Sequence, residues 1–270
     1  PLAPLLWAAR LPPPIGVVYR FARSTDDIAD EGDFPAAVRL HRLAQFNEQL
    51  SRIERGDPVE EPLFEALAGI ISAHRLPLGP FRDLLSAFSQ DCVKPRYADF
   101  DELLDYSRRS ANPIGRLLLH LFDAYETDAV AWSDRICTAL QLINFWQDVA
   151  IDVAKNRIYL PLADLRRFAV TEAQLGRGEA NSEFRSLMRY QVERTRSLLY
   201  QGAALGQRLK GRAGLEIRMV IAGGDTILQK IVAADYDVFR HRPVLEPRDW
   251  VRMLVRSLCG DGRMVPSHAA

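Results

Sequence analysis

The sequence has few cysteines, no net charge and no long uncharged run. Its three cysteines, Cys92, Cys137 and Cys259, lie far apart and form no CxxC pair, which argues against a disulfide framework and favours a reducing, cytoplasmic setting. The 35 basic and 35 acidic residues balance, so no binding of nucleic acid by bulk charge is expected. The longest uncharged run in the body of the chain, residues 136–147, is shorter than the ~18 residues that a membrane-spanning helix needs. We expect no transmembrane anchor, and peripheral association with a membrane remains open.

Apolar residues do recur at helical spacing along almost the whole chain. Leu63, Leu67 and Ile70 form one such stripe, and residues 184–209 carry another. Prolines fall between the periodic runs, where they end helices or occupy first turns. No strand-like alternation exceeds four residues. We predict an all-α fold of about ten to twelve helices, in a single domain that covers residues 1–270.

Three Asp-x-x-x-Asp pairs occur, whereas chance placement of 21 aspartates in 270 positions gives ~1.6 such pairs. The flanking residues must therefore distinguish them. Asp101 and Asp105 lie at an expected helix start, where negative charge is favoured by the helix dipole. We interpret this pair as structural.

A second pair, Asp26 and Asp30, shares a predicted helical stripe with Tyr19, Arg23 and Asp27, because residues three and four apart are neighbours on a helix. Taken alone, this pattern fits two interpretations. One is a metal-binding face, and the other is a solvated acidic face in which Arg23 pairs with Asp27.

The third pair lies in the run 140–152, which is otherwise mostly apolar and aromatic. Spacings of three, four and four place Gln141, Asn144, Asp148 and Asp152 on one face of a helix that should be buried nearly all round. Buried carboxylates need compensating cations. This stripe therefore predicts a functional site.

We expect the two aspartate stripes to face each other across a cavity and to bind Mg²⁺, the predicted cofactor. Magnesium usually takes one or two carboxylates together with water and phosphate oxygens. Metal ions and arginines stabilise a departing diphosphate, and an apolar wall would accept a long hydrocarbon. The predicted substrate is a prenyl diphosphate.

Three stretches, residues 19–31, 106–115 and 141–161, resemble the squalene/phytoene synthase family of isoprenoid enzymes. The segments SANPIG at 110–115 and NFWQD at 144–148 resemble its bacterial hydroxysqualene synthase branch, which serves hopanoid-type squalene production. The resemblance implies an isoprenoid-synthase helical fold with a central cavity. It also implies magnesium ligation, and with it catalysis, by Asp26, Asp30, Asp148 and Asp152.

The resemblance further implies a set of residues that contact the substrate diphosphate or line its site: Tyr19, Arg23, Asp27, Tyr106, Gln141, Asn144, Arg157, Tyr159 and Arg242. Some of these have alternative interpretations. Arg157 is alternatively a helix cap and Tyr159 a packing residue, while Arg240 is as basic as Arg242 and only two residues away.

The chain departs from the family pattern at several positions. Gln147 stands where condensing relatives usually carry arginine, and Asp225 stands about where many relatives have tyrosine. The family's N-terminal flap is not evident before Tyr19. Two interpretations of Pro113 are open. In the first, Pro113 kinks a helix and frees the carbonyl of Arg109, which with Asn112 orients a water molecule toward the cavity. In the second, Pro113 begins a new helix that Asn112 caps.

Because Gln147 replaces the arginine of condensing relatives, the chain has one cation fewer beside Asp148. A site for two prenyl diphosphates must neutralise twice the charge, so this difference favours an enzyme that binds a single diphosphate. The first hypothesis is therefore conversion of presqualene diphosphate to hydroxysqualene with release of diphosphate. The alternatives are head-to-head condensation of two prenyl diphosphates to squalene, phytoene or dehydrosqualene, and a non-catalytic helical partner of a synthase. Other enzymes of the squalene pathway are the protein partners to consider.

Overall fold

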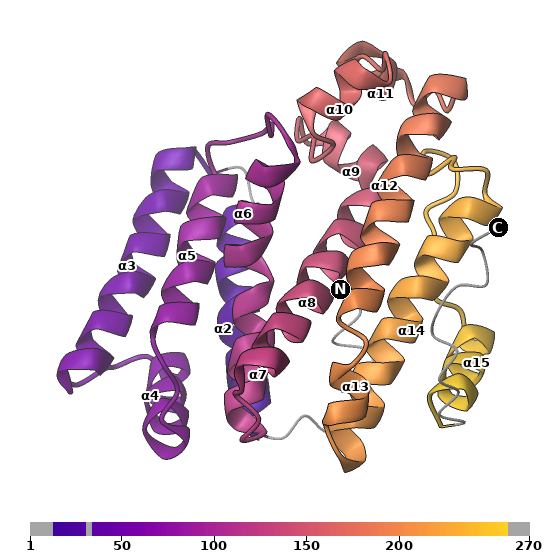
Figure 1. Cartoon of the computed structure of the whole chain (residues 1–270). Coiled ribbons are helices and arrows are strands. Elements are labelled where there is room, and N and C mark those ends of the chain that lie inside the picture. Colours follow the sequence, from indigo (N-terminus) through magenta and orange to yellow (C-terminus); the bar gives the residue numbers. More distant parts are fainter. Residues whose placement is uncertain (1–12, 31–33, 259–270) are drawn as a thin grey trace. The chain divides into compact units, whose positions relative to one another are not determined.

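A computed structural model describes residues 13–30 and 34–258, and it is built from helices (Figure 1). These residues contain no strand, and a lone β-bridge joins Arg96 to Ile158, which confirms the all-α prediction. The chain forms two compact units. The N-terminal unit contains the described residues up to 94 together with 105–130, and the C-terminal unit contains residues 95–104 and those from 131 onward. The single domain expected from the sequence remains a prediction.

The N-terminal unit is a helical bundle in which α2 packs against α3, α4, α5 and α7. Its helices are α2 (Pro13–Asp30), α3 (Ala36–Arg55), α4 (Pro62–His74), α5 (Gly79–Asp91) and α7 (Asn112–Leu121). Two further helices, α6 (Phe100–Ser110) and α8 (Thr127–Gln147), continue from one unit into the other.

Aromatic residues form the core of this bundle. Phe21 of α2 packs edge-on against Phe81 of α5, with ring centroids 5.2 Å apart, and Phe46 packs against Phe64 at 5.0 Å. Edge-to-face packing of this kind adds ~0.5–1.5 kcal/mol per pair to the burial of the rings. Because Phe21 fixes which side of α2 points inward, the opposite side of that helix is left exposed.

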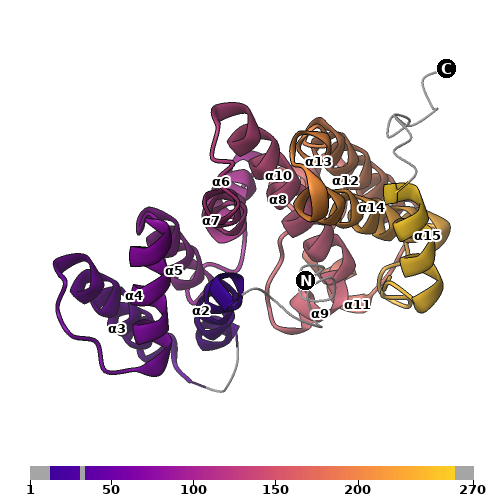
Figure 2. The same cartoon turned by 90° about the horizontal axis from the view of Figure 1, so that it is seen from below.

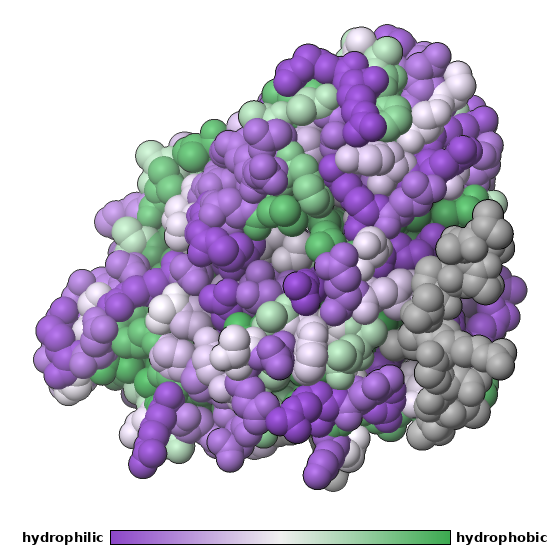
Figure 3. Space-filling view, in the orientation of Figure 1, coloured by the Kyte–Doolittle hydropathy of each residue, from purple (hydrophilic) through white to green (hydrophobic). Residues whose placement is uncertain are grey.

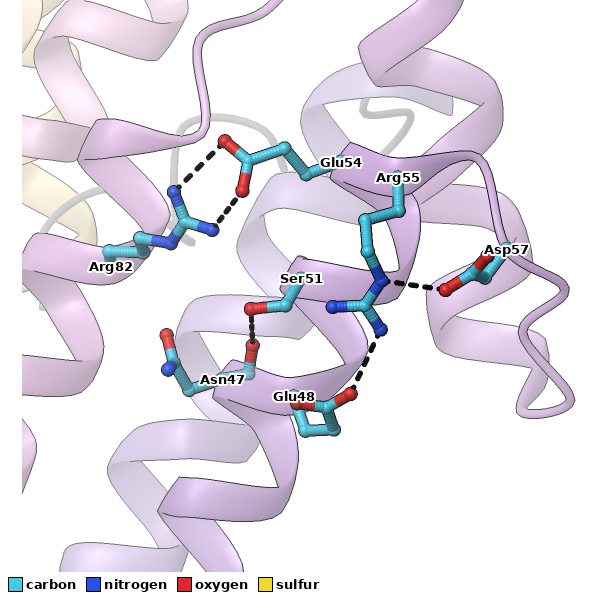
Figure 4. Close-up of polar contacts among 7 residues, drawn as sticks. All are labelled: Asn47, Glu48, Ser51, Glu54, Arg55, Asp57 and Arg82. Carbon is cyan, nitrogen blue, oxygen red and sulfur yellow. Dashed lines mark hydrogen bonds and ion pairs between the residues drawn. The ribbon is translucent and has the colours of Figure 1, made fainter.

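Ion pairs fasten the end of α3 on the outside of the bundle (Figure 4). Arg82 of α5 donates to both carboxylate oxygens of Glu54, at 3.2 and 2.5 Å. Arg55 bonds Asp57 and Glu48 at 2.7 and 3.1 Å. These pairs are exposed, so each contributes little to stability. We interpret them as contacts that hold α3 to its neighbours, and not as part of a functional site.

The C-terminal unit contains short helices followed by three longer ones. It comprises α9 (Val149–Ala154), α10 (Leu162–Arg167), α11 (Glu172–Arg177), α12 (Ser182–Gln201), α13 (Leu205–Arg208), α14 (Gly211–Ala233) and α15 (Pro247–Leu258). Both views show α14 beside α12 on one side and α15 on the other (Figures 1 and 2).

The core of this unit forms around α8, α12 and α14. Trp146 is fully buried, and its indole Nε1 donates to Thr195 Oγ1 of α12 at 2.8 Å. Gly224 of α14 lets the helices approach closely, since a Cβ there would lie 3.1 Å from Ile143 and 3.2 Å from Leu199. The buried side of α8 is thereby fixed, which also fixes the side that carries its polar residues.

Fourteen helices occur in the described part of the chain, more than the ten to twelve expected. The additional ones are short, because longer periodic runs are interrupted, as at Asp148 and at Gly202. Prolines mark helix starts as predicted: Pro62 and Pro80 lie in first turns, and Pro161 immediately precedes α10. Most of the surface in Figure 3 is polar, with smaller hydrophobic patches among the polar residues.

The structure decides between the two interpretations of Pro113. Helix α6 ends at Ser110 and α7 begins at Asn112, with Pro113 in its first turn. The proline therefore begins a new helix, which confirms one of the two interpretations, and the mid-helix kink of the other is wrong. The expected cap is also wrong, because Ala111 occupies the N-cap and makes no side-chain capping bond, while Asn112 is a buried helical residue.

We expect Gly202→Ala to destabilise the protein. A Cβ at this residue would lie 2.6 Å from the backbone oxygen of Trp132 and 2.6 Å from Ile136 Cγ1, so α8 and the end of α12 would have to separate. Overpacking of this kind costs ~1–3 kcal/mol, to be measured by urea unfolding. Gly69→Ala is the matched control in α4, where nothing lies within 4 Å of the new methyl group. An equal loss in both variants would contradict the close approach.

Candidate active-site residues

The polar stripe predicted on α8 is present and marks the partly exposed side of a buried helix. Gln141, Asn144 and Asp148 are partly exposed, whereas residues 142, 143, 145, 146 and 147 are buried. Hydrogen bonds from Asp148 N to Asn144 O (3.0 Å) and from Asp152 N to Asp148 O (2.8 Å) keep the spacing of one turn. The sequence pattern therefore placed these side chains on one face correctly.

The helix itself is not continuous as predicted. It ends at Gln147, Asp148 has φ −104° and ψ 13°, and α9 begins at Val149. Aspartate is unfavourable inside helices because its side chain forms hydrogen bonds that compete with those of the helix backbone. Here the carboxylate is bound by an arginine that is distant in the sequence.

Arg242 makes a two-pronged ion pair with Asp148. Its Nε lies 2.5 Å from Oδ1 and its Nη2 lies 3.2 Å from Oδ2. The hydrogen bond to Asp148 raises the pKa of Arg242 above its ordinary value. The alternative cation, Arg240, is highly exposed and lies 3.7 Å from Asp237. Of the two arginines weighed from the sequence, Arg242 is the one that reaches the aspartate motif.

Gln147 holds the segment that carries Arg242. Its amide Nε2 is buried and donates to Pro243 O at 2.6 Å. Two adjacent residues of the aspartate motif, Gln147 and Asp148, thus bind two adjacent residues of the later segment, Arg242 and Pro243. The glutamine that departs from the family pattern thus binds the segment of Arg242, a contact that sequence reasoning missed.

We expect Gln147→Met to reduce kcat/KM about five- to tenfold, since loss of one such hydrogen bond costs ~1 kcal/mol or somewhat more. Methionine keeps the volume of glutamine and cannot donate to Pro243. In an Arg242→Gln background the same change should have no further effect, which a double-mutant cycle measures. Full additivity of the two changes would show that Gln147 does not act through Arg242.

A small pocket adjoins Asp152. Its lining consists of Phe145, Val149, Asp152, Val153, Arg157, Ile158, Tyr159 and Leu160. Tyr159 stacks on Phe145 with ring centroids 3.8 Å apart and on Tyr97 at 5.5 Å, so it is a packing residue that also lines the pocket. Arg157 N donates to Asp152 O at 2.8 Å. Three of the residues predicted for the site therefore meet here, beside an apolar wall.

In the N-terminal unit, α2 carries the other predicted stripe on the side opposite Phe21. Arg23 lies 3.1 Å from Asp26 and 2.7 Å from Asp27, while Tyr19 is exposed. The Arg23–Asp27 pair weighed from the sequence is thus formed. Asp30 is the last residue of α2. The stretch before Tyr19, in which the family's N-terminal flap is not evident from the sequence, falls largely on residues 1–12, which lie outside the described residues.

Tyr106, expected at the substrate, is buried, and its hydroxyl donates to Asp91 of α5 within the same unit. The interpretation of the pair Asp101 and Asp105, as charges at a helix start, is half correct. Asp101 lies in the first turn of α6, whereas Asp105 lies further along the helix and pairs with Arg108 and Arg109 at 2.7 and 2.9 Å. The hydrogen bond to Arg108 lowers the pKa of Asp105.

Asp225, which stands about where many relatives have tyrosine, is buried and takes part in a cluster of polar side chains. Its carboxylate accepts from Gln229 at 2.7 Å and lies 3.4 Å from Arg196. The pKa of Tyr200 is raised to about 12, chiefly by burial and further by the charge of Asp225. The cluster joins α12 to α14 through polar contacts and is structural.

Asp225→Asn should lower the pKa of Tyr200 and leave it above the ordinary value of ~10, because burial remains. Phenolate absorbance during an alkaline titration measures this, with Tyr200→Phe to identify the signal. Since the folded pKa exceeds the unfolded one, the stabilising contribution is complete below pH ~10 and is lost as the pH rises toward 12. An unchanged Tyr200 pKa would contradict the coupling to Asp225.

The two motifs offer carboxylates in pairs, one turn apart and partly exposed. In the described part of the chain, no group of three or more His, Cys, Asp or Glu side chains is close enough to hold a metal ion. Paired carboxylates fit magnesium chemically, because that ion completes its shell with water and phosphate oxygens. In the structure, Arg23 pairs with Asp26 and Asp27, and Arg242 pairs with Asp148.

An all-α fold with two aspartate-bearing helical faces defines the class of helical isoprenoid synthases. The family model for squalene/phytoene synthase matches residues 1–249, and the chain belongs to that family. It is a prenyltransferase-type enzyme of isoprenoid biosynthesis, so the alternative of a non-catalytic partner is not supported.

Relatives with three different names are similar to this chain. A phytoene synthase of Arthrospira platensis is 32% identical over 89% of this chain and 81% of its own length. A hydroxysqualene synthase of Zymomonas mobilis is 33% identical over 82% of this chain and 74% of its own length. The crystal structure of squalene synthase HpnC from Alicyclobacillus acidocaldarius has a TM-score of 0.77 and 34% identity, with 82% of each chain covered.

Proposed function

We propose that this enzyme converts presqualene diphosphate to hydroxysqualene with release of diphosphate, in the presence of Mg²⁺. The observation that carries the proposal is Gln147. The residue before Asp148 is neutral, and its amide is committed to Pro243. On the aspartate face of α8 and α9, Arg242 is bound to Asp148 and Arg157 lies beside the pocket. Among the described residues, Arg242 is the cation that forms an ion pair with Asp148. This supports one diphosphate rather than two.

The roles of the site residues follow from their chemistry. Asp26, Asp30, Asp148 and Asp152 would hold magnesium, which supplies positive charge to a departing diphosphate. Arg23, Arg157 and Arg242 are forked donors suited to phosphate oxygens. Asp27 would keep Arg23 in place, and Tyr19, Gln141 and Asn144 would offer polar contacts. Phe145 and Tyr159 give the pocket an aromatic wall. Loss of diphosphate would leave a carbocation, and one water molecule would have to add to it, with release of a proton, to give the alcohol.

The alternative is head-to-head condensation of two prenyl diphosphates, and the phytoene synthase relative favours it about as strongly. Product analysis distinguishes the two. Presqualene diphosphate with magnesium should yield hydroxysqualene and diphosphate, whereas farnesyl diphosphate alone should yield no C30 product. A C30 hydrocarbon or presqualene diphosphate formed from farnesyl diphosphate by this protein alone would establish condensation and overturn the proposal.

A further inference from the structure

The inner face of α15 is fixed against α14. Asp249 and Met253 are buried, and Lys230 of α14 binds Asp249 Oδ2 at 2.7 Å. Near the other end of the helix, Arg218 Nε donates to the backbone oxygen of Ser257 at 2.9 Å. Contacts at both ends therefore determine which side of α15 points away from the bundle (Figure 2).

That outward side is apolar. Val251 is 66% exposed, Val255 54% and Leu254 40%, and their spacing places them next to one another on the helix. Single exposed hydrophobic residues are ordinary on protein surfaces. Three neighbours on one turn form a stripe that a soluble helix has no structural reason to expose. No described helix is long and apolar enough to cross a membrane.

A row of arginines borders the apolar stripe. Arg248, Arg252 and Arg256 follow one another at intervals of four, and all three are exposed. Arg248 pairs with Glu246 at 2.6 Å, and Arg256 lies 3.7 Å from Asp225. The one acidic residue of the helix, Asp249, faces inward to Lys230. Arg248 and Arg252 therefore form a basic border beside the apolar strip on the outer side of α15, whereas Arg256 turns toward Asp225 of α14.

We propose that this outer side of α15 docks on the surface of an anionic lipid bilayer. A helix with an apolar stripe and a basic border lies in the membrane interface, with the apolar residues among the acyl chains and the cations at lipid phosphates. A second copy of the chain is a poorer occupant, because two rows of arginines would be brought together. The inference uses no residue of the proposed active site and does not depend on the proposed reaction.

Co-sedimentation of the whole chain with lipid vesicles tests the proposal. The protein should bind vesicles of phosphatidylcholine with about one third phosphatidylglycerol, and bind pure phosphatidylcholine weakly. Val251→Asp with Val255→Asp should reduce binding at least about tenfold, since charges enter the acyl region at high cost. The matched control is Val38→Asp with Val93→Asp, two exposed valines of the N-terminal unit, which should bind like the wild type.

A second pair of variants tests the electrostatic part. Arg252→Gln should weaken binding to anionic vesicles about fivefold, the equivalent of ~1 kcal/mol per basic residue at the surface. Arg135→Gln, at an exposed arginine of α8, should not change it. Circular dichroism checks that each variant is folded.

Three results would overturn the proposal. The first is that the wild type does not bind anionic vesicles. The second is that the Val251→Asp/Val255→Asp variant binds as well as the Val38→Asp/Val93→Asp control. The third is that the Val251→Asp/Val255→Asp variant changes its oligomeric state and still binds vesicles. The last would identify an interface between copies. Diphosphate release from detergent-dispersed substrate, measured in parallel, reports on the proposed function separately, and the α15 variants should retain it.

Discussion

Asp148→Asn and Asp26→Asn are each expected to reduce diphosphate release by at least about 10³-fold. Each change removes one negative charge from a motif whose carboxylates we assign to magnesium, and it changes the volume of the side chain little. Both aspartates are partly exposed, so neither change creates a cavity in a core. Single-turnover release of diphosphate with saturating magnesium measures the loss.

The matched control is Asp101→Asn in the first turn of α6. It also removes a helical aspartate of a DxxxD pair, and we expect activity within about twofold of the wild type and a small loss of stability, ~0.3–1 kcal/mol, from the helix dipole. Thermal unfolding should show all three variants to be folded. Substantial turnover by Asp148→Asn or Asp26→Asn would refute the assignment of that motif to the metal.

Arg242→Gln should lower kcat/KM about 10²- to 10³-fold, the usual loss when one preorganised donor to a developing anion is removed. The guanidinium already lies on Asp148 through two bonds, at 2.5 and 3.2 Å, so it is held beside the proposed diphosphate site. Arg242→Lys should recover only part of the activity, because an ammonium cannot make the forked contact.

Arg240→Gln is the control for this second prediction. It removes the same charge two residues away, from a side chain that is highly exposed and only loosely paired with Asp237. We expect nearly unchanged kinetics. If Arg240→Gln and Arg242→Gln lost activity equally, the general positive charge of the segment would matter and the specific contact with Asp148 would not.

The local part of this site was predictable from the sequence. Helical periodicity placed Gln141, Asn144, Asp148 and Asp152 on one face, and the structure shows that face partly exposed on an otherwise buried helix. The same reasoning placed the acidic side of α2. Spacing along a helix determines such faces, because neighbouring residues and their directions follow from the helix geometry alone.

The long-range part was not predictable in the same way. Asp148 and Arg242 are 94 residues apart, and Gln147 and Pro243 are 96 apart, so no local pattern connects them. Arg242 was named through resemblance to a family, whereas the contact that distinguishes it from Arg240 comes from tertiary structure. The bond between Tyr106 and Asp91 was missed for the same reason, since periodicity reports which face a residue occupies and not its partner.

The division of the chain into two units has a consequence for its folding. Neither unit is a continuous stretch of sequence, because residues 95–104 belong with the C-terminal unit while 105–130 belong with the N-terminal one. The chain passes between the units within the helices α6 and α8. Any single cut that separates the gene into two pieces therefore leaves at least one unit without part of its own helices. At least one of the two pieces should therefore fail to fold when expressed alone. Distant segments must come together before either core is complete, which slows folding.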